Sequence, residues 1–126
     1  MKISRFLAAA TLALALPGAA LAHVEVTAST PAEGASVKAP RSLTIAFSAP
    51  VDPATTGVAI VMTDMPGVPD HGEMVIRNFT PEWAEDRRTL HLALRKPLPR
   101  GTYELRWQAP ASDGQTMRGV INFVVI

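Results

Sequence analysis

Absent residue types set the first limits on the chemistry of this chain. None of its 126 residues is cysteine, so no disulfide stabilises the fold and stability must come from a packed core. For the same reason, a metal site here must use histidine, methionine, carboxylate or backbone ligands. Catalytic patterns are absent as well. The sequence has no Gly-x-Ser-x-Gly nucleophile elbow, and its three histidines lack the context of a Ser-His-Asp triad.

An excess of one charge is also lacking. The 12 lysines and arginines are balanced by 11 aspartates and glutamates, which gives a formal net charge of +1. No basic patch or basic run stands out, so we expect no nucleic-acid partner. The chain length suits a single domain with one core.

The longest apolar run lies near the start of the chain. Lys2 and Arg5 precede an apolar run over residues 6–16, and a small-x-small motif ends at Ala22. These are the parts of an export signal, and the run is too short for a bilayer span, which takes about 20 residues. We therefore expect residues 1–22 to be a cleaved signal peptide rather than a retained membrane anchor.

Cleavage after Ala22 makes His23 the first residue of the mature chain. The mature domain is then residues 23–126, a single β domain with no membrane span.

Alternating apolar residues predict strands rather than helices. Residues 42–47, 89–94 and 102–107 each place an apolar side chain at every second position, the pattern of a strand with one buried face. Residues 58–61 and 120–126 are more continuously apolar, so we expect strands that are covered on both faces.

Turn signals between these segments indicate the fold class. No segment after residue 22 combines a sustained 3.6-residue apolar period with helix caps. One helical turn over residues 82–88 is the most helix that we expect, and residues 74–79 are expected to form one strand. About seven short strands predict an all-β fold, an immunoglobulin-like or Greek-key β-sandwich or barrel.

Three of the five methionines gather in one segment with a histidine. Met62, Met65, His71 and Met74 lie in a stretch broken by prolines and glycines. Thioether sulfur and imidazole nitrogen suit Cu(I), and methionine keeps a soft donor in an oxidising compartment where exposed cysteines form disulfides. A turn between two strand ends would bring these side chains onto one ion, so the segment predicts a Cu(I) site.

Ordinary packing is the alternative for these methionines. Methionine fills irregular gaps in cores, and Met62 follows an apolar strand in which it would serve that role. Met65 and His71, by contrast, lie among aspartates, prolines and glycines typical of a surface loop, where a methionine gains little from packing. Composition and spacing alone leave both interpretations open.

His23 offers a second set of ligands once the signal peptide is removed. Its free α-amine, with a pKa of about 7.7–8.0, and its ring Nδ1 would chelate one ion together. Two nitrogens and a carboxylate form the tetragonal site that Cu(II) prefers. The alternative is a frayed terminal residue with no role.

Several of these motifs, in the same order, resemble the CopC/PcoC family of periplasmic copper-resistance proteins. The methionine segment resembles the family's Cu(I) loop, and His23 stands directly after the signal peptide. The further matches resemble the family's first turn, second strand, late strand and Ser-Asp-x-His segment; they are Thr30-Pro-Ala-Glu-Gly34, Leu43-x-Ile-x-Phe-Ser48, Gly101-Thr-Tyr-x-Leu-x-Trp107 and Ser112-Asp113.

The resemblance implies two copper sites at opposite ends of a small β-barrel. The Cu(I) site would use Met62, Met65, His71 and Met74. Val68 occupies a loop position where close relatives can have another methionine, which leaves three thioethers.

The implied Cu(II) site departs more from the family pattern. It would use the amine and ring of His23, with Asp113 and a second histidine. Gln115 stands where that histidine is expected, and an amide oxygen is a poorer copper ligand than imidazole, so we expect a weakened site. His91 is expected to be a surface residue on the outward face of a strand, and Met117 is equally consistent with packing.

These features together predict a periplasmic copper-binding protein that carries or buffers copper for resistance and homeostasis, and not an enzyme. Its expected partners are copper ions and a membrane copper transporter or another periplasmic copper protein. One alternative is a metal-free immunoglobulin-like interaction module, for which the strands alone would suffice. The other is a copper redox enzyme with an N-terminal histidine ligand, which Gln115 disfavours because that chemistry needs a second imidazole.

Overall fold

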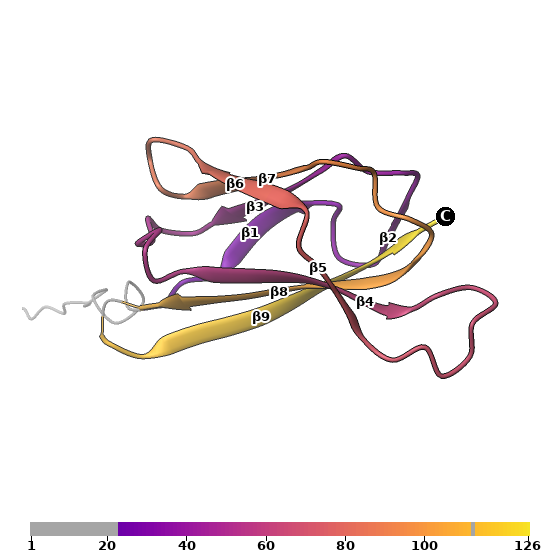
Figure 1. Ribbon diagram of the computed structural model, residues 1–126. Helices are drawn as coiled ribbons and strands as arrows, with labels where there is room; N and C mark the ends of the chain where they lie inside the picture. Colours follow the sequence, from indigo (N-terminus) through magenta and orange to yellow (C-terminus); the bar gives the residue numbers. More distant parts are fainter. Residues whose placement is uncertain (1–22, 112) are drawn as a thin grey trace, which may run out of the picture.

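Two β-sheets packed face to face make up the protein (Figure 1). The computed structural model describes residues 23–111 and 113–126. The expected signal peptide, residues 1–22, lies outside this range. Within the described residues there is no helix that would span a bilayer, and all regular structure is strand. The expected all-β sandwich is therefore confirmed.

The first sheet has four antiparallel strands in the order β1-β3-β7-β6. Its strands are β1 (Val26–Thr30), β3 (Ser42–Phe47), β7 (Thr89–Leu94) and β6 (Phe79–Trp83). The alternating segments at 42–47 and 89–94 thus form strands with the predicted bounds. Pro81 is tolerated in β6 because that strand lies at the edge of the sheet.

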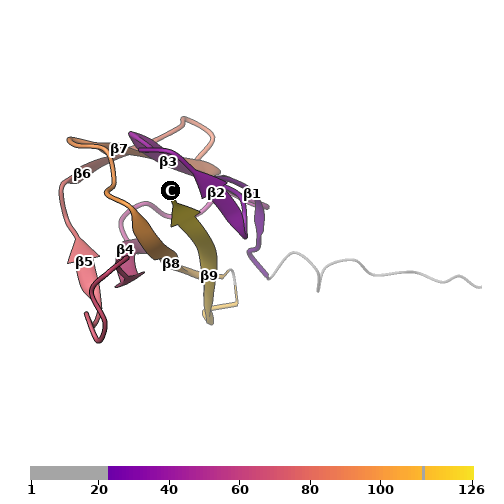
Figure 2. The ribbon, with the colours of Figure 1, turned by 90° about the vertical axis from the view of Figure 1, so that its right-hand side faces the viewer.

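The second sheet has five strands in the order β2-β9-β8-β4-β5. They are β2 (Ala35–Val37), β9 (Thr116–Val125), β8 (Gly101–Pro110), β4 (Gly57–Asp64) and β5 (Met74–Ile76). The short β2 pairs in parallel with β9, and the other pairs are antiparallel. Figure 2 shows the two sheets as layers seen from one end.

The core lies between the two sheets and follows the predicted alternation. The apolar positions of β3, β7 and β8 are all buried, and the Phe47 and Trp107 rings meet edge to face with 5.4 Å between centroids. The buried residues of these strands are Leu43, Ile45, Phe47, Leu90, Leu92, Leu94, Tyr103, Leu105, Trp107 and Ala109. A period of two in the sequence therefore identified the inner face of each strand.

Residues 120–126 were expected to be covered on both faces, and this is wrong. Ile121, Phe123 and Val125 point into the core, whereas Val120 is 47% exposed and Val124 is 36% exposed. The reason is architectural, because the sandwich has only two layers and the outer face of β9 is open to solvent. β-Branched residues favour a strand whether or not a second layer covers them.

The segment after the methionine region also differs from expectation. Residues 74–79 form no single strand, because β5 ends at Ile76 and the chain crosses to the other sheet, where β6 begins at Phe79. Nor do residues 82–88 make a helical turn. They finish β6 and then form a tight turn in which the Arg87 N–H donates to the Ala84 carbonyl at 3.0 Å. With the three-residue strands β2 and β5, the described residues form nine strands instead of about seven.

The candidate ligand residues lie at the two ends of this sandwich (Figure 1). Residues 65–73, here called the methionine loop, connect β4 to β5 at one end. At the other end, the start of the described chain lies beside the loop from β8 to β9. There the Glu25 N–H donates to Ser48 Oγ at 3.0 Å, which ties the entering chain to the end of β3.

Tyr103 generates a prediction for alkaline pH. Its buried hydroxyl donates to the Pro99 carbonyl at 2.6 Å, its ring stacks on Phe123, and burial raises its pKa to about 12. The unfolded chain has a tyrosine pKa of about 10. Because the pKa is higher in the folded protein, the protonated Tyr103 hydroxyl stabilises the fold. This contribution to the free energy of unfolding is complete below pH 10 and is lost as the pH rises towards 12.

We expect Tyr103→Phe to lower the free energy of unfolding at pH 7 by about 1 kcal/mol, because one hydrogen bond is lost. The variant should therefore unfold at a lower urea concentration. Between pH 9 and pH 11.5 it should lose less stability than the wild type, as measured by urea unfolding. If both proteins lose the same stability over this pH range, the pH dependence does not come from Tyr103.

Candidate metal sites

Met62 and Met74 are brought together by strand pairing. They are direct partners in the β4–β5 register, so both side chains lie on the same face of the second sheet, with β-carbons typically about 5 Å apart. Met62 is fully buried in the core, while Met74, on the edge strand, is 43% exposed. A metal ion at this end would therefore have a buried thioether beneath it and an exposed one beside it.

Met65 lies at the base of a tight turn. The Val68 N–H donates to the Met65 carbonyl at 3.1 Å, and Gly67 between them has a φ of 78°. Proline followed by glycine at the two central positions is typical of a type II turn. The Met65 side chain is half-buried and packs against the core. Its thioether is therefore held near the strand ends and not at the loop tip.

The hydrogen bonding of the His71 ring suits a metal ligand. Its Nδ1 lies 2.7 Å from the Gly72 carbonyl oxygen. A carbonyl only accepts hydrogen bonds, so Nδ1 is the donor, and in the neutral ring Nε2 is left with its lone pair. Histidines that bind metals commonly donate their other ring N–H to a backbone carbonyl in this way.

An ion-pair cluster borders the methionine loop on the outer face of the second sheet. Arg106 Nη2 lies 2.7 Å from Glu73 Oε2, and Arg106 Nε lies 2.8 Å from Glu104 Oε1. The hydrogen bond from Arg106, and then its charge, lower the pKa of Glu73. Sequence patterns did not predict this cluster. The Glu104-x-Arg106 spacing was a signal that these two residues share a face, but nothing in the sequence pointed to Glu73.

The two residues expected to bind Cu(II) lie at the other end of the sandwich. His23 is exposed, directly before the buried Val24. Asp113 is exposed in the β8–β9 loop, and its Oδ1 accepts a hydrogen bond from the Gln115 N–H at 2.9 Å. Among residues 23–111 and 113–126, no three histidine, aspartate or glutamate side chains form a metal-binding group. A Cu(II) site here would need the terminal amine as a ligand.

His91 lies where the sequence placed it, on the outward face of a strand. It is half-buried on β7, and its Nδ1 lies 3.2 Å from Thr44 Oγ1 on β3. It pairs with Glu82 on the other side. His91 therefore belongs to the first sheet, whereas Asp113 follows β8 in the second.

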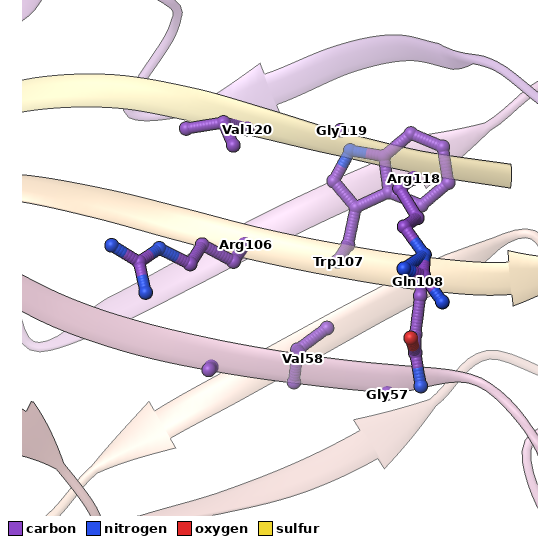
Figure 3. Close-up of a pocket in the computed structure, with 9 residues that line it drawn as sticks. Gly57, Val58, Arg106, Trp107, Gln108, Arg118, Gly119 and Val120 are labelled. Carbon is purple, nitrogen blue, oxygen red and sulfur yellow. The ribbon is translucent and has the colours of Figure 1, made fainter.

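A groove of about 570 Å³ crosses the outer face of the second sheet (Figure 3). Glycine and alanine on β4 leave room for it, between the side chains of Arg106, Gln108 and Arg118. Neither histidine nor methionine lines it, so it is separate from both candidate metal sites.

Comparison with known proteins gives a consistent result. A model of the CopC domain family matches residues 26–126. Copper resistance protein C from Pseudomonas syringae pv. tomato is 35% identical over 106 residues, which cover 84% of this chain and 82% of that protein. Copper transport protein CutJ from Bacillus subtilis (strain 168) is 28% identical over 111 residues. These make up 87% of this chain and 19% of that longer protein.

A solved structure supports the same relationship. The crystal structure of PcoC, described as a methionine-rich copper resistance protein from Escherichia coli, superposes with a TM-score of 0.72 at 30% sequence identity. The match covers 83% of this chain and all of that one.

Gly72 provides a test of whether the loop backbone controls the metal site. Its φ of 77° is strained for any residue with a β-carbon, and its carbonyl orients His71. We expect Gly72→Ala to lower stability by about 1 kcal/mol and to weaken Cu(I) binding as well.

Gly34 is a matched control for this variant. Its φ is 79°, and in both glycines an added β-carbon meets no atom within 4 Å. Gly34→Ala should lower the thermal unfolding temperature similarly and leave Cu(I) affinity unchanged. If the two variants bind Cu(I) with equal affinity, the backbone conformation at Gly72 has no effect on metal binding.

Proposed function

The chain belongs to the CopC domain family, and on that basis we propose that it binds copper ions in the periplasm and carries or buffers them for copper resistance and homeostasis. Relatives named for copper resistance and for copper transport support this proposal. The observation that carries it is the pairing of Met62 with Met74, next to a loop in which His71 keeps Nε2 free to bind.

We propose that Cu(I) is bound by Met62, Met65, His71 and Met74. Three thioethers and one imidazole are neutral donors suited to a soft ion, and binding them displaces no proton from the sulfurs. Met62 would bind from the buried side, Met65 from the base of its turn, and Met74 from the edge strand. Since His71 and Met74 are reachable from solvent, the ligands of a partner can replace them one at a time.

The Cu(II) site is proposed with fewer ligands. The amine and ring of His23 with the carboxylate of Asp113 make a tetragonal N,O set. Gln115 offers an amide where a second imidazole is expected, and its backbone N–H already engages one oxygen of Asp113. Cu(II) should therefore bind more weakly than in a site with a second histidine.

A carrier fits these sites better than an enzyme. The names of the relatives refer to copper resistance and copper transport, and none of them names a reaction. Copper redox chemistry at His23 would need a second well-held imidazole, and Gln115 occupies that position. A metal-free interaction module would show no copper-dependent stability, whereas ion binding at a hundredfold excess over Kd adds about 2.7 kcal/mol.

Export and delivery complete the proposal. Residues 1–22 act as a signal peptide, and residues 23–126 form the mature copper-binding domain. The family match over residues 26–126 supports that division. The partner that receives or supplies copper is a membrane copper transporter or another periplasmic copper protein. In favour of a transporter, this domain corresponds to about one-fifth of a copper transport protein in Bacillus subtilis.

Methionine-to-leucine substitutions test the Cu(I) site while preserving side-chain volume. Such swaps usually cost less than about 1.5 kcal/mol even in a core. We expect Met62→Leu, Met65→Leu and Met74→Leu each to weaken Cu(I) binding at least about tenfold, or 1.4 kcal/mol. Competition against a coloured Cu(I) chelator under anaerobic conditions measures this.

Met117 is a matched control for that series, because it is a half-buried methionine near the opposite end of the sandwich. Met117→Leu should bind Cu(I) like the wild type. If Met62→Leu alone among the three variants keeps the wild-type Cu(I) affinity, Met62 is a core residue and the site has three ligands. If the wild type binds neither ion at micromolar concentrations, the copper proposal is wrong.

The Cu(II) site has its own test, a titration of protein that begins at His23. Gln115→His should tighten Cu(II) binding and leave Cu(I) binding unchanged, because it supplies a second imidazole. One extra residue before His23 should weaken Cu(II) binding and leave Cu(I) binding unaffected. An unaltered Cu(II) isotherm in the extended protein would rule out the terminal amine as a ligand.

A further inference from the structure

We infer that Arg106 is a positioning and selectivity residue for the Cu(I) site, where it holds the Glu73 carboxylate away from the metal. This inference rests on the proposed Cu(I) function of the methionine loop. Arg106 itself touches none of the four proposed ligands and acts through Glu73.

The contact between Arg106 and Glu73 spans a whole strand. In the second sheet β4 lies between β8 and β5, so Arg106 on β8 must cross β4 to reach Glu73, the residue before β5. It does so with two hydrogen bonds, Nη2 to Oε2 at 2.7 Å and Nη1 to Oε1 at 3.4 Å. Glu104, on the same face, fixes the guanidinium from the other side through Nε at 2.8 Å.

Burial on β4 is consistent with this crossing. Val61 pairs with Glu104 and with Val75, so it belongs to the outer face of the sheet. That face has no second layer, yet Val61 is only 1% exposed. An aliphatic stem of Arg106 that extends over β4 to reach Glu73 would account for this burial, because long basic side chains commonly cover apolar surfaces.

The position of Glu73 links this contact to the metal ligands. Gly72, directly before it, accepts the hydrogen bond that orients His71. Met74, directly after it, pairs with Met62. β5 has only three residues, so its ladder to β4 is short, and the side-chain contact with Arg106 provides a second attachment for this end of the loop.

Glu73 also affects which metal the site prefers. A free carboxylate between His71 and Met74 would be a hard oxygen donor beside a soft site, and oxygen with imidazole favours Cu(II) over Cu(I). With both carboxylate oxygens bonded to Arg106, the side-chain donors left in the segment from His71 to Met74 are sulfur and Nε2. Arg106 thereby keeps the site selective for Cu(I).

Four variants test this inference: Arg106→Gln, Arg106→Lys, Glu73→Gln and the control Arg118→Gln. Arg118 is an outer-face arginine on β9, and Figure 3 shows the Arg106 side chain extending away from it. Within the described residues Arg118 makes no ion pair. Every protein carries one extra residue before His23, which removes the proposed terminal Cu(II) site. Cu(I) and Cu(II) affinities are then measured separately, together with the thermal unfolding temperature.

The expected pattern differs from that of a merely structural role. Arg106→Gln should weaken Cu(I) binding about tenfold, a typical loss when a residue that holds a metal-binding segment in place is removed. It should strengthen Cu(II) binding, because Glu73 becomes free to bind. Glu73→Gln should also weaken Cu(I), but without the gain in Cu(II). Arg106→Lys should recover part of the Cu(I) affinity, and Arg118→Gln should match the parent protein throughout.

Two results would overturn the inference. If the parent protein binds Cu(I) and Arg106→Gln leaves both affinities unchanged, Arg106 has no positioning role and the proposed function stands. If Arg106→Gln and Glu73→Gln lower both affinities in parallel with the unfolding temperature, the contact serves stability alone. Should Arg106→Gln fail to fold, Glu73→Gln and Arg106→Lys decide the question. A parent protein that fails to bind Cu(I) removes the proposed function, and this inference with it.

Discussion

The register of β4 between its two neighbours determines the methionine site. Met62 pairs with Tyr103 on β8 and with Met74 on β5, so one residue connects the core to the exposed edge of the sheet. A slip of one residue would turn Met62 towards solvent and remove its sulfur from this end. Gly101 helps to fix the register, because a β-carbon there would lie 2.7 Å from the Asp64 carbonyl and 3.2 Å from Met62 Cε.

The same sheet separates the two candidate copper sites. β8 runs from the methionine end to the end that carries Asp113, and its ten residues extend about 30 Å at 3.3 Å per residue. Ligands from the two ends therefore cannot meet on one ion within a single molecule. The two proposed sites therefore depend on different loops, so Gln115 has no direct contact with the proposed Cu(I) ligands Met65 and His71.

The sequence predicts those parts of the structure that depend on local patterns. β3 and β7 were located with their full bounds because each alternates strictly and has one buried face. β2 and β5 were missed as separate strands, since three residues carry too little periodicity to detect. The outer face of residues 120–126 was misjudged because valine and isoleucine favour strands on either face. The four proposed Cu(I) ligands were identified from residue type, but the pairing of Met62 with Met74 across β4 and β5 required the register.

The Arg106–Glu73 contact was beyond the reach of sequence patterns because it joins residues 33 apart that meet only across an intervening strand. Its role follows from the composition of the loop. Asp64, Asp70 and Glu73 all lie within or beside residues 65–73, so the proposed soft-metal site lies among hard donors. All three are exposed, and Glu73, which lies directly before Met74, is the one bonded to arginine. A loop that selects Cu(I) in the absence of cysteine depends as much on restraining its carboxylates as on presenting its methionines.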